Sequence, residues 1–267
     1  MPAPTATLPA ADAVEELLHL LGDEPAAGPQ RSRQRLRARL TVAPPATLPA
    51  EAWPLLDAVW AAEAQQRAPT RASELPRLAA TGWGARVSHW RGDLTTLAVD
   101  AIVNAANSGL TGCYRPDHPC VDNAIHTAAG PRLREECGEI MARRGRPEPT
   151  STATTTGGAF LPARFVIHTV GPIVAGRRPS DEDARALSRC YAACLAAAGD
   201  AGATSVAFCG ISTGVFGYPV AAAAPVAIAA VREGLAKDPR LEHVVLVTFS
   251  AADQAATASA FLEALRA

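Results

Sequence analysis

The sequence predicts an α/β protein with three layers, in which helices cover both faces of a central sheet. Short apolar segments, "AIVNAAN", "RFVIHTVG", "SVAFCGIS" and "HVVLVTFS", alternate with longer helical patterns at 119–142, 181–200, 219–236 and 251–266. Strands that alternate with helices favour a sheet covered on both sides, and the near-continuous apolar run "VVLVTF" is typical of a buried strand. Ligands of such folds bind beyond the carboxyl ends of the strands. We therefore expect function in the loops after "AIVN" and "VAFCG".

Composition and charge limit the kind of protein this is. A chain of 267 residues with 48% hydrophobic and 19% charged residues can bury a core and form one large domain with an appendage. The formal net charge of -1 gives no sign of a nucleic-acid partner. The start of the chain lacks the pattern of a signal peptide, and no run has the length of a membrane span. We expect a soluble, cytoplasmic protein with no membrane partner, whose cysteines are thiols or metal ligands.

The chain changes character near residue 82, so we expect a helical N-terminal extension at 1–82 and the main domain at 83–267. Apolar residues recur at helical spacing in two sets, Val14, Leu17, Leu18 and Leu21, and Trp53, Leu56, Val59 and Trp60. The basic stretch "QRSRQRLRARL" between them is expected to be a solvated helix face, with a phosphate-binding patch as the alternative. We expect the extension to pack on the main domain, although recruitment of a partner stays open. Within the main domain, "PTSTATTTGG" is expected to lead into the strand at 164–170.

Polar side chains stand at two predicted strand ends. Asn104 and Asn107 close the segment "AIVNAAN", where amides could grip hydroxyl groups by donating and accepting at once, or could cap a turn. Asp93, in "WRGDLTTL", could accept a hydrogen bond from an exocyclic amine such as that of adenine. Taken singly, Asp93 favours the reading of an ordinary turn aspartate.

The stretch "GCYRPDHPCVDNAIH" at 112–126 predicts a metal site. Cys113, His118 and Cys120 offer the thiolate and imidazole ligands that zinc takes in tetrahedral geometry. Structural zinc sites close all four positions, whereas three protein ligands leave one for water or substrate. Cys120 is expected at a helix start, whose positive end favours a thiolate. We therefore expect zinc of the catalytic type, and buried cysteines beside a surface histidine are the alternative.

The helix after Cys120 adds a possible acid–base pair. Asp122 and His126 are four residues apart and share a face. The carboxylate could orient the histidine or act as a base towards water, and a simple helix-surface pair is equally compatible with the spacing. His168 lies in an apolar strand and is expected in the core, as are the remaining cysteines, Cys137, Cys190, Cys194 and Cys209.

The loop "CGISTGVFGYP" (209–219) leaves a predicted strand and enters a helix near Pro219. Gly210, Gly214 and Gly217 allow tight turns with exposed N–H groups, and the helix adds its positive N-terminal end. That arrangement suits a diphosphate, while a glycine-rich connection without a ligand is the alternative. The loop is not a P-loop, because no Gly-Lys-Ser/Thr follows.

Taken together, "GD-L...VDAIVNAAN", "VDNAIH-x-AAG", "VIHTVGP" and "ISTGVFGYP" resemble the macrodomain family, whose members bind ADP-ribose. The usual glycine-rich run between the asparagines and "VD" is here replaced by "TGCYRPDHPC". That substitution resembles the bacterial zinc-containing macrodomains, close to the MacroD-type hydrolases, which also carry a helical N-terminal extension. The resemblance covers about residues 86 to 266 and implies a three-layer αβα macrodomain with a mixed central sheet.

The resemblance also implies site residues. Asp93 would bind the adenine amine with Leu94 beside it, and Asn104 and Asn107 would address the distal ribose. The diphosphate and ribose would lie within Ser212, Thr213, Gly214, Val215 and Phe216, with Tyr218 close by. Cys113, His118 and Cys120 would hold one zinc ion per chain. The catalytic group would consist of Asn107, Asp122, its partner His126 and a zinc-bound water.

The activity that the resemblance implies is that of a zinc-dependent protein-ADP-ribose hydrolase. It would remove a single ADP-ribose from an acidic side chain, with aspartate the expected one, and release ADP-ribose. In the zinc-containing group the modified protein is a lipoyl-carrier protein and the modifying enzyme a sirtuin. Three readings stay open: a module that binds ADP-ribose without hydrolysing it, an O-acetyl-ADP-ribose deacetylase, and a purely structural zinc.

Overall fold

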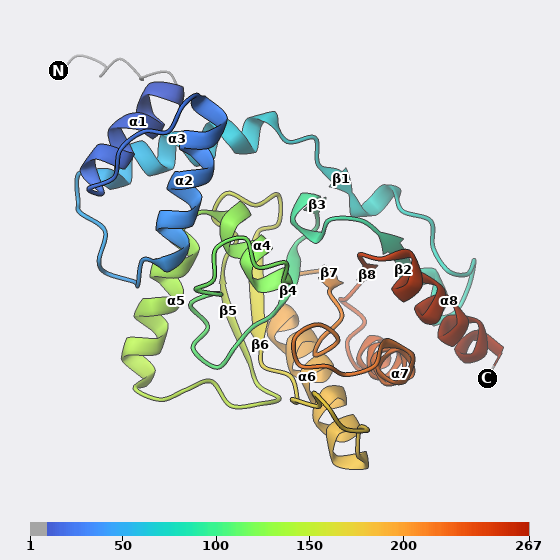
Figure 1. Cartoon of the computed structure of the whole chain (residues 1–267). Helices are drawn as coiled ribbons and strands as arrows, with labels where there is room; N and C mark the ends of the chain where they lie inside the picture. The colour runs from blue at the N-terminus through green and yellow to red at the C-terminus, as the bar shows by residue number, and fades with distance from the viewer. Residues whose placement is uncertain (1–9, 267) are drawn as a thin grey trace.

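The computed structural model describes residues 10–266 and contains, within them, a six-stranded sheet between two layers of helices (Figure 1). The strand order is β2-β8-β7-β4-β6-β5. Its strands are β2 (Val87–Arg91), β4 (Ala101–Ala105), β5 (Ala153–Gly157), β6 (Phe165–Thr169), β7 (Ser205–Phe208) and β8 (His243–Thr248). Neighbouring strands pair in parallel, except that β5 runs antiparallel to β6. The predicted three-layer α/β fold with a mixed sheet is confirmed.

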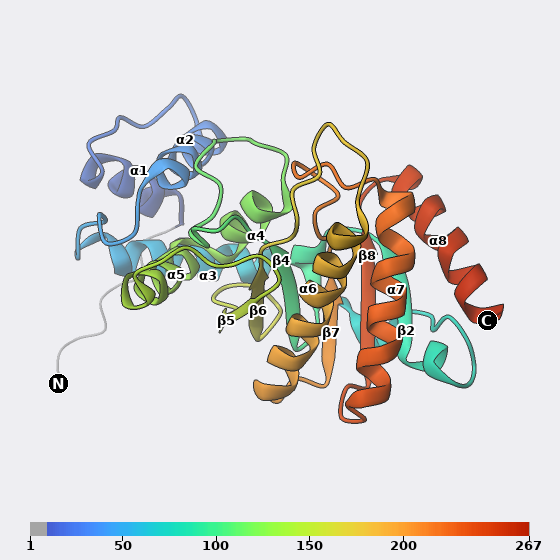
Figure 2. The same cartoon turned by 90° about the horizontal axis from the view of Figure 1, so that it is seen from below.

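Helices cover both faces of the sheet because its central strands are apolar on both sides. On one face lie α4 (Val121–Ala129) and α5 (Pro131–Arg144), and on the other lie α6 (Asp181–Asp200), α7 (Val220–Lys237) and α8 (Ala251–Arg266). Ile102 of β4 packs with the first layer and its neighbour Val103 with the second. In Figure 2, α6 and α7 cross the sheet face that looks away from α4. Each fully buried large aliphatic side chain contributes about 1.5–3 kcal/mol to this packing.

The predicted helix at 119–142 is divided into α4 and α5 at Gly130. Gly130 has a φ of 83°, and Pro131 at the start of α5 has no N–H with which to continue the hydrogen bonds of α4. A Cβ at Gly130 would lie 2.7 Å from Cδ1 of Trp60, so the break also makes room for a tryptophan of the N-terminal helices. The other predicted helices at 181–200, 219–236 and 251–266 correspond to α6, α7 and α8.

The stretch "PTSTATTTGG" leads into β6 as expected, but it also contains a strand that the sequence did not predict. Residues Ala153–Gly157 of this stretch form β5, the antiparallel edge strand. Threonine is β-branched and suits a strand. Thr154 and Thr156 are buried and alternate with half-buried neighbours, so the strand turns one row of hydroxyl groups into the protein.

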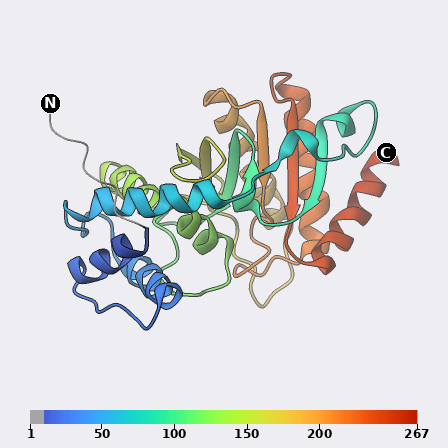
Figure 3. The same ribbon diagram turned by 90° about the horizontal axis from the view of Figure 1, so that it is seen from above.

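The N-terminal region forms a helical cluster with its own small core. It contains α1 (Ala10–Leu20), α2 (Pro29–Val42) and α3 (Ala52–Gln66), and residues 1–9 of the predicted extension lie outside the described residues. Leu17, Leu36, Leu56 and Trp60 meet in its core. Figures 1 and 3 show the cluster beside α4 and α5, at the opposite end of the molecule from α8.

Buried polar contacts join this cluster to the main domain. The indole Nε1 of Trp60 donates to the carbonyl of Thr127 at 2.9 Å. Arg134 of α5 is 7% exposed, and its Nη1 donates to the carbonyl oxygens of Leu40 at 3.0 Å, Thr41 at 2.6 Å and Ala43 at 3.0 Å. The last carbonyls of a helix need partners from outside it, and Arg134 supplies them for α2. The extension packs on the main domain, as expected.

Short elements connect the helical cluster to the sheet. β1 (Thr70–Arg71) leads into the 3-10 helices η1 (Ala72–Glu74) and η2 (Trp83–Arg86). β1 pairs in parallel with β3 (Leu97–Ala98), which follows the 3-10 helix η3 (Leu94–Thr96). Among the described helices, none combines the length and apolar character needed to cross a bilayer.

Candidate active site

A cleft of about 1120 Å³ follows the carboxyl ends of four neighbouring strands, β2, β8, β7 and β4. Its walls include the loops that come directly after these strands, and the sequence predicted function in two of them, those after β4 and β7. Residues 112–120, here called the cysteine loop, also line the cleft, as do the exposed face of α4 and part of α2. Typical small-molecule pockets measure about 300–1,000 Å³, so this cleft has room for a long ligand.

At the β2–β8 end, the cleft offers a carboxylate beside an exposed aromatic ring. Asp93 follows β2, and its Oδ1 accepts hydrogen bonds from the backbone N–H of Thr95 at 2.9 Å and from the Thr95 hydroxyl at 2.8 Å. Asp93 thus caps the 3-10 helix η3 with Oδ1, and its Oδ2 remains available to a ligand. Leu94 lies beside it, and Phe249 follows β8 on the neighbouring strand with 82% of its surface exposed. A carboxylate with a free flat ring suits a heteroaromatic amine.

In the middle of the cleft, the glycine loop at 209–219 presents backbone donors. Within the described residues, the N–H groups of Gly214, Val215 and Phe216 have no backbone acceptor. Ser212 has a φ of 66°, a left-handed conformation that costs a non-glycine residue about 1–2 kcal/mol, and its carbonyl is held by the N–H of Tyr218 at 2.9 Å. The N-terminus of α7 adds its positive end next to this loop. These donors suit a diphosphate.

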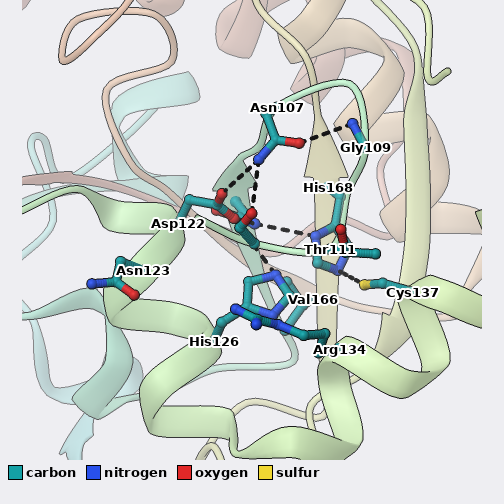
Figure 4. Close-up of polar contacts among 12 residues, drawn as sticks. Asn107, Gly109, Thr111, Asp122, Asn123, His126, Arg134, Cys137, Val166 and His168 are labelled. Carbon is teal, nitrogen blue, oxygen red and sulfur yellow. Dashed lines mark hydrogen bonds and ion pairs between the residues drawn. The ribbon is translucent and has the colours of Figure 1, made fainter. Parts of the chain in front are cut away.

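At the β4 end, Asp122 is fixed by two amides (Figure 4). Asn104 donates from Nδ2 to Oδ1 of Asp122 at 2.8 Å, and Asn107 donates from Nδ2 to Oδ2 at 3.2 Å. Asn107 also holds the start of the cysteine loop, because its Nδ2 donates to the carbonyl of Gly112 at 3.0 Å. Burial raises the pKa of Asp122 to about 6, although the bonds from the two asparagines and the charge of Arg134 oppose the rise.

His126 lies behind Asp122 and away from the cleft. The two residues share a face of α4 as predicted, with Nε2 of His126 3.6 Å from Oδ1 of Asp122, which is too long for a good hydrogen bond. Burial, then the neighbouring His168 and Arg134, lowers the pKa of His126 well below its usual range, so the ring is neutral. Its part in any reaction is therefore indirect.

The residues expected to contact ADP-ribose fall into two groups. Asn104, with no exposed surface, and Tyr218, 2% exposed, are buried behind the cleft wall. Asn104 therefore orients Asp122, and Tyr218 supports the glycine loop. The others line the cleft: Asp93, Leu94, Asn107, Ser212, Thr213, Gly214, Val215 and Phe216.

The cysteine loop brings the three predicted metal ligands together on the cleft wall. The ligand atoms of Cys113, His118 and Cys120 all lie within 4.8 Å of one another, and Sγ of Cys113 is 3.5 Å from Nδ1 of His118. Cys120 is the N-cap of α4, and its sulfur accepts from the N–H of Asn123 at 3.4 Å. Two sulfurs and an imidazole are a donor set typical of zinc. The residues present therefore fit the metal that the sequence predicted.

Cys120 lies at the start of α4 as expected, but the protein atoms around it do not favour the thiolate by themselves. Burial raises the pKa of Cys120 to about 11, and Cys113 beside it adds to this, against the bond from Asn123. A bound cation reverses this balance, because thiolate is the form that ligates metal. The state of Cys120 thus depends on the metal rather than on the helix.

Arg134 also contacts the cysteine loop, through the ring of Tyr114. Its guanidinium lies 4.6 Å from the centre of the Tyr114 ring. Gly112 has a φ of 85°, and a Cβ there would lie 2.9 Å from Cγ of His126 and 3.1 Å from Nη2 of Arg134. Glycine is required at this position because both the backbone conformation and the close approach exclude a side chain.

A second group of potential ligands, His126, Cys137 and His168, lies within the core. Nδ1 of His168 is 3.2 Å from the Asn104 amide nitrogen, which donates, so Nε2 carries the proton and faces the Thr156 hydroxyl at 3.0 Å. A protonated ring nitrogen is no metal ligand, and burial raises the pKa of Cys137 to about 12. His168 and Cys137 are core residues, as expected from the sequence.

Sequence reasoning missed several residues that line the cleft. Phe249 ends the apolar segment "HVVLVTFS", and an aromatic residue at a strand end was the signal that could have found it. Arg37 of α2 and Arg67 after α3 also line the cleft. Arg37 belongs to the basic stretch for which a phosphate-binding patch was the alternative, but nothing local in the sequence connects either arginine to a site more than 25 residues further along the chain.

The chain is similar in sequence to known proteins. A family model described as Macro domain matches residues 103–227. A curated relative from Treponema medium named "Protein-ADP-ribose hydrolase" is 51% identical over 166 residues, 62% of this chain and 63% of that protein. One of the same name from Staphylococcus aureus is 43% identical over 170 residues, 64% of each. This chain thus spans less than two thirds of the length of these relatives.

Solved structures are similar over more of their length. The Oceanobacillus iheyensis macrodomain with MES bound is 35% identical with a TM-score of 0.62, covering 67% of this chain and 92% of that one. The Trypanosoma brucei macrodomain in complex with ADP-ribose is 28% identical with a TM-score of 0.64, covering 84% of this chain and 94% of that one.

Proposed function

Because this chain belongs to the macrodomain family and has its fold, we propose that it binds ADP-ribose and hydrolyses mono-ADP-ribose from acidic side chains of modified proteins. Aspartate is the expected modified residue, and ADP-ribose is the product. The names of the Treponema medium and Staphylococcus aureus relatives support the hydrolase activity. The resemblance to zinc-containing macrodomains adds a lipoyl-carrier protein modified by a sirtuin as the candidate substrate.

The order of the groups along the cleft supports ADP-ribose as the ligand. A carboxylate and an aromatic ring stand at the β2–β8 end, free backbone N–H groups follow β7, and an amide follows β4. The same order, adenine, diphosphate and distal ribose, runs through ADP-ribose. Asp93 would accept from the adenine amine, Gly214 and its neighbours would donate to the phosphates, and the distal ribose would reach Asn107 and the cysteine loop.

The observation that carries the hydrolase proposal is the cluster of Cys113, His118 and Cys120 on the cleft wall next to Asp122. These three residues would hold a zinc ion. A zinc ion with three protein ligands supplies Lewis-acid polarisation to a bound oxygen atom. A cluster of this kind at the distal-ribose end favours a reaction there over binding alone.

The chain's own residues supply position and a base. Asp122 lines the cleft with one oxygen held by Asn104 and the other by Asn107, so its remaining lone pairs would be available to a ribose hydroxyl or a water. A base fixed in this way acts on a bound proton without reorganising. Asn107 donates both to Asp122 and to the carbonyl of Gly112 at the start of the cysteine loop. This amide therefore fixes the position of the base relative to the loop. The carboxylate released from an aspartate ester is a good leaving group and needs little help from an acid.

The test is release of ADP-ribose from a protein modified on aspartate, with and without a chelator, and with metal content and ADP-ribose affinity measured on the same sample. We expect release, about one zinc per chain, and loss of release with the chelator. Release that survives metal removal would contradict the zinc requirement alone. ADP-ribose binding without release in either sample would overturn the hydrolase and make the protein a reader.

A further inference from the structure

Beyond the cysteine loop, the cleft has an arm that lies over α4, here called the α4 groove. Its floor consists of small side chains on one face of the helix: Val121, Ala124, Thr127 and Ala128. One wall is α2, through Arg37 and Ala38, and the other includes Arg67, whose Nη2 donates to the carbonyl of Ala128 at 2.9 Å. The groove therefore lies between the N-terminal extension and the main domain.

The rim of the α4 groove carries excess positive charge. Glu63 of α3 pairs with Arg33 at 3.2 Å, with Arg37 at 2.9 Å and with Arg67 at 4.0 Å. One carboxylate thus serves three guanidinium groups, which leaves two positive charges over in this described cluster. The Arg37 side chain is 43% exposed, so it is free to meet a ligand. A positive rim over a floor of small, mostly apolar side chains favours an anionic chain that lies flat.

The positive rim of the α4 groove is not needed for the diphosphate of ADP-ribose, because the glycine loop supplies donors for that group. The cysteine loop and the α4 groove line one cleft, and Val121 of the groove floor directly follows Cys120. If the distal ribose lies at the cysteine loop, the side chain attached to it leaves on the side away from the diphosphate. The first turn of α4, with Val121 and Ala124, lines the same cleft next to the cysteine loop and is therefore within reach of that side chain.

We propose that the α4 groove binds the polypeptide around the modified side chain, and that Arg37 favours substrates with acidic residues next to that side chain. This inference rests on the proposed function and names the substrate class of the same site. Arg33 and Arg67 share Glu63 and so keep Arg37 from being fully neutralised. The small floor residues allow a peptide backbone to approach α4 closely. The N-terminal extension, through α2, then contacts the substrate and contributes to its selection.

The test compares two peptides of equal length, each carrying one ADP-ribosylated aspartate, flanked in one by glutamate and in the other by glutamine. For the unaltered protein we expect kcat/KM to be about fivefold higher for the glutamate peptide, mainly through KM, and the ratio to fall as salt rises. The ratio of the two peptides is the readout, so any change common to both cancels.

Charge reversal at matched positions separates the groove from general electrostatics. Arg37→Glu should bring the ratio to one or below, and Ala38→Glu should do the same while leaving the Arg37–Glu63 pair in place. Arg31→Glu makes the same change of net charge on the same helix, at an exposed residue outside the described cleft lining, and should keep the preference. Equal loss of preference in the Arg31 and Arg37 variants would overturn the proposal, as would a ratio near one in the unaltered protein.

Failure of the proposed function gives a different result from failure of this inference. If the unaltered protein releases ADP-ribose from neither peptide, the hydrolase proposal has failed, and the intact peptides then serve as binding ligands. A tighter dissociation constant for the glutamate peptide, lost in Arg37→Glu and kept in Arg31→Glu, supports the groove. Equal dissociation constants for both peptides reject it.

Discussion

Replacing Arg134 with Met is expected to loosen the N-terminal helices from the main domain. The substitution keeps much of the apolar stem and removes the guanidinium. The carbonyl oxygens of Thr41 and Ala43 then lose this donor, and both residues are at most 8% exposed, whereas the Leu40 carbonyl keeps the N–H of Ala43. The ring of Tyr114 also loses its cationic partner.

The magnitude follows from the partners that are left behind. A buried polar group without a partner costs about 1–3 kcal/mol, which for two carbonyls exceeds what the protein regains by no longer burying a charge. We expect a loss of about 3 kcal/mol in the free energy of unfolding. A protein of this kind has about 5–15 kcal/mol in total, so the variant stays folded and measurable.

Urea denaturation followed by circular dichroism measures the loss, and amide hydrogen exchange locates it. Exchange should accelerate in α1, α2 and α3 more than in α6 or α7. Arg134→Lys should lose only about 1 kcal/mol, because an ammonium retains three donors but not the flat contact with Tyr114. Arg132→Met is the matched control on the same helix: its pair with Asp57 is exposed, so it should cost about 1 kcal/mol or less. A loss in Arg134→Met no greater than in Arg132→Met, with unchanged exchange in the extension, would refute this reasoning.

Other parts of the site give three more predictions. Cys120→Ala should bring the zinc content, measured by plasma emission, from about one per chain to near zero, whereas Cys190→Ala in the core should keep it; retained zinc in the first variant would exclude the cysteine loop as the site. Asp93→Asn retains the cap of η3 but loses the charge, so calorimetry should show ADP-ribose binding about tenfold weaker, and unchanged affinity would place adenine elsewhere. Burial lowers the pKa of His168 from 6.5 to about 4, so the unfolded chain binds more protons in that window and stability is lost as pH falls through it. His168→Gln should flatten this fall in the free energy of unfolding, and parallel pH curves for both proteins would contradict the assignment.

Local patterns predicted the elements that carry their own signals. The boundaries of α6 agree with the sequence because Ser180 and Asp183 form a capping box at its start. The cysteine loop was found because its ligands lie within eight residues of one another. By contrast, β5 is a run of threonines without apolar alternation, so its role as an edge strand depends on β6 beside it.

The site residues that the sequence did not predict depend on contacts between segments that lie far apart in the chain. Arg37 and Arg134 read as ordinary helix-surface residues in the sequence, because arginines are usually solvated. Their roles arise only when α2 is placed against α4 and α5, which residue spacing does not encode. Asn104 was expected at the ligand, yet the register of β4 with β6 directs it towards His168 and Asp122.

The hydrogen bonds beneath the cleft connect the edge of the sheet to its centre. Thr156 on β5 bonds to His168 on β6, His168 to Asn104 on β4, and Asn104 to Asp122 on α4. A substitution on β5, two strands away from β4, can therefore change how Asp122 is held. In a selection for restored activity after weakening Asn104, we expect second-site revertants on β5, at positions that a map of ligand contacts would leave out.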